Sequence, residues 1–170
     1  MDDDLGPSIG GTLRSAGGEG VVRMKSRYGS DRNVTWSALT DPQRFGHWYG
    51  KVKDDLLFGG EFTAFVFANE WNGRGRIDAC VPQQRLEVTM WEEEGKEHSV
   101  IAELVADGHL TTVELEARGW PMDLVWAYGV GWQVHLEDLG VHLSGQEKLN
   151  LPTRWDELEP LHRGMTVTPL

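Results

Sequence analysis

The feature that most constrains the fold of this chain is a series of short β-prone segments followed by one long helical stripe. The six segments are similar in length, are separated by Gly, Asn, Pro or acidic clusters, and span residues 54–58, 61–68, 71–81, 85–91, 98–105 and 110–118. This spacing is typical of an antiparallel meander. Several segments alternate apolar and charged side chains, so we expect one buried and one solvated sheet face.

The long stripe lies in residues 121–143, where apolar side chains recur every three or four positions, as on one face of a helix. A first strand is expected near residues 21–28. Cap-type side chains at 30–33 and the sequence Thr40-Asp41-Pro42 then predict two short helices. The order predicts an α+β fold. A curved antiparallel sheet of about six to seven strands wraps round the long C-terminal helix, with two short helices after the first strand.

A chain of 170 residues fits a single domain. Residues 1–19 contain three Asp and five Gly and few apolar residues, which predicts a flexible N-terminal tail. Residues 20–145 are expected to form the domain. The C-terminal extension, 146–170, is expected to pack on the domain or on a dimer mate.

The long helix also carries apolar residues opposite its core stripe, so it needs a second covering. These residues are Val130, Val134 and Val141. We expect an ordered segment at 150–163 to supply the covering, through Leu151, Trp155, Leu158 and Leu161.

The net charge of −11 repels phosphate backbones and anionic lipid heads, so neither nucleic acid nor a membrane surface is an expected partner. The lone Cys80 cannot form an internal disulfide, and we expect it to be a buried, inert thiol. The acidic start Met1-Asp2-Asp3-Asp4 is unlike a signal peptide. A cytoplasmic protein is therefore expected.

Several motifs occur along the chain in a characteristic order. They are Val34-x-Trp36-x-Ala38-Leu39-Thr40-Asp41-Pro42 followed by Trp48, Gly59-Gly60-x-Phe62, Val81-Pro82-x-x-Arg85-Leu86, Thr111-Thr112-Val113-Glu114-Leu115, and Gly131-Trp132 followed by Leu136 and Leu139. Together they resemble the SRPBCC (START/birch-pollen-allergen-like) superfamily, and within it the bacterial domains homologous to the activator of heat-shock-protein-90 ATPase. The resemblance implies a helix-grip fold with a hydrophobic cavity between the long helix and the concave sheet.

The resemblance does not imply one activity, because a fold hosts many functions. The favoured hypothesis is a non-enzymatic protein that holds a small apolar or aromatic molecule in that cavity, without a cofactor. A cyclase- or hydrolase-like enzyme in the same cavity is the first alternative. The second is a co-chaperone-like interaction module that uses the outer sheet face, with the cavity closed by side chains.

Strand alternation and the abundance of Trp, eight in all, select the residues expected at the cavity. They are Trp36, Trp48, Phe62, Ile77, Val88, Met90, Leu104, Val113, Trp132, His135 and Leu136. On a helical projection, Trp126 lies far from the Trp132 line and is expected outside the cavity. No catalytic residue is assigned, but His135 and His47 are candidates for acid–base chemistry. A metal site is not expected, because His135 and His142 lie about 10 Å apart along a helix axis.

The outer sheet face carries a further candidate surface. If Phe62, Ala64 and Val66 face the core, then Phe65 and Phe67 face outward near Arg74 and Arg76. Such a patch is an interface for a partner protein or for a homodimer. The alternative is a one-residue strand slip that turns the Phe side chains inward.

Overall fold

The computed structural model describes residues 8–53, 60–66, 71–92, 97–145 and 151–169. In this part of the chain, nine strands form one sheet in the order β3-β4-β5-β6-β7-β8-β2-β1-β9. The elements are β1 (Ser8–Ala16), β2 (Glu19–Tyr28), α1 (Arg32–Thr40), α2 (Pro42–Phe45), β3 (Gly50–Lys53), β4 (Glu61–Val66), β5 (Trp71–Val81), β6 (Arg85–Trp91), β7 (Glu97–Asp107), β8 (Leu110–Pro121), a 3-10 turn (Met122–Leu124), α3 (Val125–Leu143), α4 (Leu151–Arg163) and β9 (Val167–Pro169).

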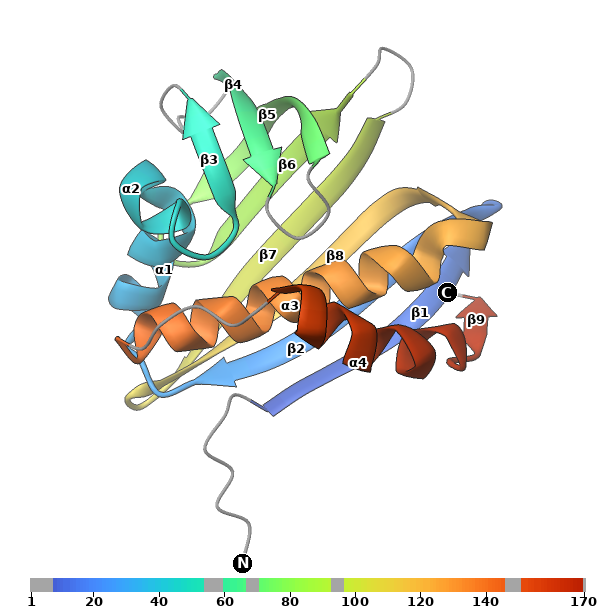
Figure 1. Ribbon diagram of the computed structural model, residues 1–170. Helices are drawn as coiled ribbons and strands as arrows, with labels where there is room; N and C mark the ends of the chain where they lie inside the picture. Colours follow the sequence, from blue (N-terminus) through green and yellow to red (C-terminus); the bar gives the residue numbers. More distant parts are fainter. Residues whose placement is uncertain (1–7, 54–59, 67–70, 93–96, 146–150, 170) are drawn as a thin grey trace, which may run out of the picture.

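The helices are distributed unevenly over the curved sheet (Figure 1). The long helix α3 lies across the half formed by β8, β2 and β1, and α4 runs beside it. The half formed by β3 to β6 bends away from α3, and α1 and α2 lie at one end of the sheet. The predicted α+β class, the helix-grip arrangement and the two short helices are confirmed.

The strand number differs from the six to seven expected, because both chain ends contribute strands. The expected strand at 54–58 lies outside the described residues, and the chain forms β3 just before it. At the other edge, β1 pairs antiparallel with β2, and β9 pairs parallel with β1. Arg14 supports the edge by donating hydrogen bonds to the Thr168 hydroxyl at 3.0 Å and to the Pro169 carbonyl at 3.3 Å.

The prediction of a flexible tail is wrong for residues 8–16, while residues 1–7 lie outside the described residues. The segment is Gly-rich, but all nine residues of β1 align with β2, whose backbone supplies the hydrogen-bond partners. Leu13, which is 2% exposed, adds an apolar anchor. Composition does not predict such a strand, because the strand is stabilised by pairing with β2 and not by its own apolar content.

A local signal explains the start of α2, whereas at α1 the side chain of Asp31 makes no capping hydrogen bond, contrary to the expected cap at 30–33. The Asp41 carboxylate accepts a hydrogen bond of 3.0 Å from the backbone N–H of Gln43, and Pro42 occupies the first turn of α2. The sequence Thr40-Asp41-Pro42 therefore acts as the predicted cap.

A buried hydroxyl relay joins the sheet to α3. Ser26 on β2 donates to the Tyr28 hydroxyl at 2.8 Å, and Tyr28 donates to the carbonyl of Leu136 at 2.7 Å. Burial raises the pKa of Tyr28, so this phenol stays protonated and remains a donor. The relay fixes α3 over β2 and away from β3 to β6.

The second apolar side of α3 is covered by α4 of the same chain. Leu158 is 1% exposed and forms a cluster with Val130 and Val134, flanked by Trp126 and Trp155. Arg154 on α4 donates to both carboxylate oxygens of Glu137, at 2.5 and 2.7 Å. The C-terminal segment was expected to pack on its own domain or on a dimer mate, and in this structure α4 packs on its own domain.

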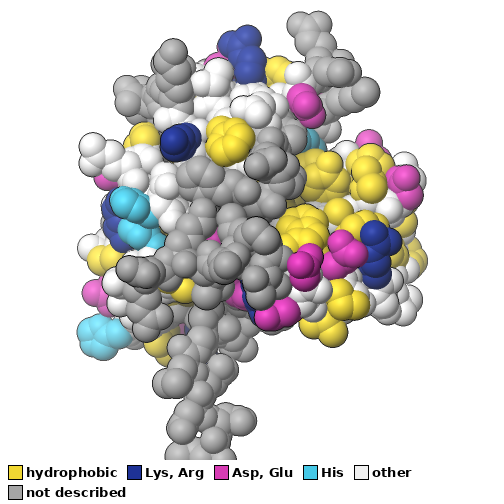
Figure 2. Space-filling model, in the orientation of Figure 1, with side chains coloured by type: hydrophobic (Ala, Val, Ile, Leu, Met, Phe, Trp, Pro, Cys, Tyr) yellow, Lys and Arg dark blue, Asp and Glu magenta, His cyan; other side chains and the backbone are white. Residues whose placement is uncertain are grey.

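The cover is incomplete. Leu161 is 65% exposed, contrary to the expectation that it packs on α3, and Val141 is only half-buried. The side chain of Leu151 lies outside the described residues. Hydrophobic side chains gather over α4 and the N-terminal end of α3, bordered by acidic ones (Figure 2). Among the described helices, none is long and apolar enough to span a membrane.

Two leucines on α4 test this packing. Leu158→Ala should lower the free energy of unfolding by about 2–5 kcal/mol, because it leaves a cavity against Val130 and Val134. Leu161→Ala, on the exposed side of the same helix, should change it by less than about 0.5 kcal/mol. Urea unfolding measures both, and equal losses would contradict the assignment.

Candidate functional site

An apolar cavity of about 70 Å³ lies between α3 and the concave face of the sheet. We call it the apolar chamber. Its walls come from α1, α2, the segment before β3, strands β4 to β8, and α3. The lining residues are Leu39, Phe45, Trp48, Tyr49, Phe62, Ile77, Leu86, Val88, Met90, Val100, Ala102, Leu115 and Trp132.

Strand alternation places the chamber walls. Phe62, Ala64 and Val66 of β4 are buried, while Glu61 and Thr63 are exposed and Phe65 is half-buried. The Phe62 ring lies against Gly75 of β5, where an added Cβ would come within 2.3 Å of the ring. Gly75 thus provides the space that lets the ring lie flat on the sheet.

A second cavity of about 30 Å³ adjoins the first. We call it the polar chamber, because nitrogen- and oxygen-bearing aromatic side chains form much of its wall. The lining residues are Tyr49, Val66, Met90, His98, Val100, Trp120, Tyr128, Gly131, Trp132 and His135. Tyr49, Met90, Val100 and Trp132 line both chambers and form the division between them.

Ring stacking fixes the side chains around the polar chamber. The Trp120 ring lies 3.8 Å from His98 and 3.5 Å from Tyr128, measured between ring centroids. The Tyr49 ring contacts His135 at 4.5 Å and Trp132 at 5.5 Å. The rings therefore pack in two sets around the polar chamber, one from β7, β8 and α3 and the other from α3 and the segment before β3.

Two hydrogen-bond donors around the polar chamber lack an oxygen or nitrogen acceptor within the described part of the chain. The indole N–H of Trp120, a residue 7% exposed, has no hydrogen-bond partner there. The Tyr49 hydroxyl donates to the Met90 sulfur at 3.6 Å, and a thioether is a weak acceptor. Burial raises the pKa of Tyr49, so its phenol stays protonated.

Burial also keeps His98 neutral at physiological pH. Desolvation lowers the pKa of His98 from 6.5 to about 4, because the charged ring would lose water on entering this environment. His98 is 9% exposed, in agreement with that cause. The polar chamber therefore gains no positive charge from this residue near pH 7.

The structure brings together most, but not all, of the residues expected at the cavity. Trp48, Phe62, Ile77, Val88, Met90 and Trp132 line the apolar chamber, and Met90, Trp132 and His135 line the polar chamber. Trp126 lies outside both, among the residues that pack on the α4 side of α3.

The other expected residues lie outside both chambers. Leu104, Val113 and Leu136 are buried in the continuous core, and Trp36 packs against its edge from α1. Alternation predicted their inward direction correctly. It did not predict how far along each strand α3 closes onto the sheet.

Sequence reasoning missed Tyr49 and Trp120. Tyr49 follows the short helix α2 in a turn, where no periodicity indicates direction. Trp120 is the next-to-last residue of β8 and follows Gly119, whose positive φ of 96° lies at a β-bulge opposite Gly20 and Val21. The one available signal was the high number of Trp residues, whose indole N–H groups need acceptors.

The two histidine candidates are separated. His135, 4% exposed, lines the polar chamber, whereas His47 is exposed outside both chambers. The His47 ring stacks on His142 at 5.3 Å, and Arg44 donates to the Nε2 atom of His142 at 3.3 Å. Of the two, His135 alone could act on a molecule in a chamber.

Other reactive or metal-binding arrangements are not present in the described residues. No three His, Cys, Asp or Glu side chains there are grouped as metal ligands. Cys80 is half-buried and packs against the edge of the core. It is therefore more accessible than the expected buried thiol.

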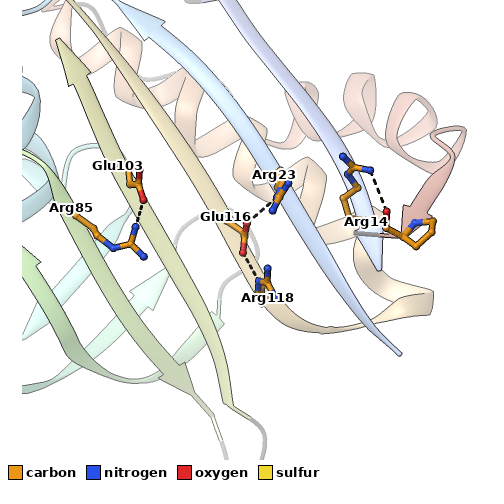
Figure 3. Close-up of polar contacts among 7 residues, drawn as sticks. Arg14, Arg23, Arg85, Glu103, Glu116 and Arg118 are labelled. Atoms are coloured by element: carbon orange, nitrogen blue, oxygen red, sulfur yellow. Dashed lines mark hydrogen bonds and ion pairs between the residues drawn. The ribbon is translucent and has the colours of Figure 1, made fainter. Parts of the chain in front are cut away.

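The outer sheet face carries several ion pairs between Arg and Glu side chains. Glu116 on β8 accepts from Arg23 on β2, at 2.8 Å, and from Arg118 on its own strand (Figure 3). Arg85 on β6 pairs with Glu103 on β7. These strands border an open hollow of about 760 Å³. Its charges are already paired, so a ligand there would compete with both the ion pairs and water.

The expected outer patch is only partly present. Phe65 is half-buried and aligns with Lys51 and Asn72 in neighbouring strands, so the strand slip did not occur. Phe67 lies outside the described residues. Arg76 lies over the Trp91 ring at 5.8 Å and pairs with Asp78.

Comparisons with known proteins agree with this geometry. The sequence model of the family described as "Activator of Hsp90 ATPase homolog 1-like protein" matches residues 30–144. A search of curated protein sequences gave no significant match.

Solved structures resemble the whole fold. A crystal structure of CalU16 from Micromonospora echinospora has 26% identity and a TM-score of 0.70, covering 93% of this chain and 99% of CalU16. A solution structure of CalU16 has 25% identity and a TM-score of 0.71, covering 96% and 100%. DynU16, from the dynemicin biosynthetic locus, has 22% identity and a TM-score of 0.69, covering 77% of this chain and 50% of DynU16.

The low pKa of His98 predicts a defined acid sensitivity. The unfolded chain binds a proton at His98 below about pH 6.5, whereas the folded chain does so only near pH 4. The contribution of neutral His98 to the free energy of unfolding is therefore fully present above pH 6.5. It is lost as the pH falls to about 4, a loss on the order of 3 kcal/mol.

Urea unfolding of the wild type and of His98→Asn between pH 7 and 4 checks this prediction. The wild type should lose more stability than His98→Asn across that window. His109→Asn, which removes a histidine whose side chain is fully exposed, is the control for the loss of one imidazole ring. Parallel curves for the wild type and His98→Asn would contradict the burial assignment.

Proposed function

The chain belongs to the family of Activator of Hsp90 ATPase homolog 1-like proteins, and from this premise we propose that it binds a small aromatic molecule between α3 and the concave sheet face. The observation that carries the proposal is the apolar chamber, which is lined by apolar and aromatic side chains beside Trp132. Such a lining favours a ligand with a large apolar surface. DynU16 comes from a biosynthetic locus, a setting in which small molecules are handled, which supports this ligand class.

Chamber size limits the ligand. Pockets for drug-sized molecules measure about 300–1,000 Å³, and a dry cavity of about 150 Å³ accepts benzene. The apolar chamber of about 70 Å³ and the polar chamber of about 30 Å³ are smaller. Even together they are smaller than the benzene cavity, so a ligand of one ring enters only if the division between the chambers moves.

Met90 is the part of the division that can move at lowest cost. Its side chain is unbranched and adapts to irregular spaces, and a thioether is a weak acceptor for the Tyr49 hydroxyl that it now holds. Displacement of Met90 would join the two chambers and free that hydroxyl. Tyr49 and Trp132 are rings held by stacking and are less adaptable.

A second candidate function is favoured by the small volume itself. If protein atoms fill most of the space, the concave face acts as a core and the outside of the domain carries the function. A co-chaperone-like module would then bind its partner through the outer sheet face. Measuring the ATPase rate of a heat-shock-protein-90 chaperone with and without this protein tests that candidate.

Filling the apolar chamber tests the ligand proposal. The wild type should bind α-methylstyrene, a single-ring hydrocarbon, with a dissociation constant of about 1 mM or lower. Val88→Phe places a ring in the chamber and should weaken binding at least about tenfold. Titration followed by NMR chemical shifts measures the affinity.

Val105→Phe is the matched control, because Val105 is 51% exposed on the neighbouring strand β7 and lines neither chamber. Its affinity should equal that of the wild type. If the wild type binds neither α-methylstyrene nor its ketone analogue acetophenone, the proposed function is overturned. Unchanged binding in Val88→Phe would place the site elsewhere.

A further inference from the structure

We propose that the polar chamber is a subsite for one uncharged acceptor oxygen of the ligand, held by the Trp120 indole N–H and the Tyr49 hydroxyl. The inference rests on the proposed function and specifies the ligand class: a single aromatic ring that bears a carbonyl oxygen. The ring occupies the apolar chamber, and the oxygen occupies the polar chamber.

The first support is an unused donor. Trp120 lines the polar chamber, and its buried N–H has no acceptor in the described residues. Leaving a donor buried without a partner costs about 1–3 kcal/mol. An incoming oxygen would remove that cost, and the stacked His98 and Tyr128 rings hold the indole in place for it.

The second support is a donor with a weak partner. Tyr49 lines the same chamber, and its hydroxyl is bound to the Met90 sulfur. A carbonyl oxygen is a stronger acceptor than a thioether, and its two lone pairs can accept from two donors at once. Moving Met90 to admit a ligand therefore exchanges a weak hydrogen bond for a stronger one.

The third support is size and continuity. A volume of about 30 Å³ is enough for a small group such as a carbonyl oxygen and too small for a second ring. The polar chamber adjoins the apolar chamber through shared walls at Tyr49, Met90, Val100 and Trp132. One molecule can thus place its ring and its oxygen in adjacent spaces.

The chamber favours a neutral oxygen over a carboxylate. Burial lowers the pKa of His98 to about 4, so this ring supplies no positive charge near neutral pH. Neither Lys nor Arg is among the residues that line the chamber. A carboxylate would lose its hydration there, and neither His98 nor a Lys or Arg side chain would supply a compensating positive charge.

A pair of ligands of nearly equal shape isolates the oxygen. Acetophenone and α-methylstyrene differ by C=O against C=CH₂. The wild type should bind acetophenone about five- to tenfold more tightly than α-methylstyrene, and at least about tenfold more tightly than benzoate. Tyr49→Phe and Trp120→Phe should each bring the acetophenone preference down to about twofold or less, with α-methylstyrene affinity nearly unchanged.

Trp126→Phe is the matched control on α3. The Trp126 indole already donates to the Asp123 carbonyl at 3.1 Å and lines neither chamber, so the acetophenone preference should persist. A direct readout does not depend on any variant folding. The Trp120 indole N–H proton resonance of the wild type should shift downfield with acetophenone and not with α-methylstyrene.

The outcomes separate the two proposals. If neither ligand binds the wild type, the proposed function and this inference both fail. If both ligands bind equally, and the Trp120 resonance responds to both alike, the function stands and the oxygen subsite is overturned. An acetophenone preference that survives in both Tyr49→Phe and Trp120→Phe also overturns it.

Discussion

The packing of a straight helix against a curved sheet is the constraint on which the rest of this structure depends. The Tyr28 relay joins α3 to β2, while the half of the sheet formed by β3 to β6 bends away from the helix. Side chains must fill the space that opens there, and aromatic residues from α3, from β8 and from the segment before β3 do so. Rigid rings rarely fill an irregular space completely, and two chambers remain between them.

The chambers differ in chemistry because different parts of the chain reach them. Alternating strands project apolar side chains into the larger chamber. The polar chamber instead receives residues near element ends, where Trp120 brings an N–H that has no partner in the described residues and Tyr49 brings an O–H bound to a thioether. A ligand with a ring and one oxygen complements both chambers, whereas a fully apolar ligand complements one.

The sequence predicted directions better than positions. Periodicity indicated correctly that Phe62, Ile77 and Trp132 point inward, because side-chain direction follows directly from the strand and helix repeats. It placed Leu136 at the cavity as well, since that residue follows Trp132 by one turn. At that level α3 meets Tyr28, so Leu136 is core. The strand β1 escaped prediction for a related reason: a Gly-rich segment becomes a strand when a partner edge supplies its hydrogen bonds.

Ligand binding between α3 and the sheet requires the apolar chamber to be empty, dry and reachable. A crystal pressurised with xenon tests this most directly. Xenon enters apolar cavities that exclude water. We expect one xenon peak between Trp132 and Phe62, with an ordered water, if any, confined to the polar chamber beside Trp120. Absence of xenon together with side-chain or water density throughout the apolar chamber would contradict the account.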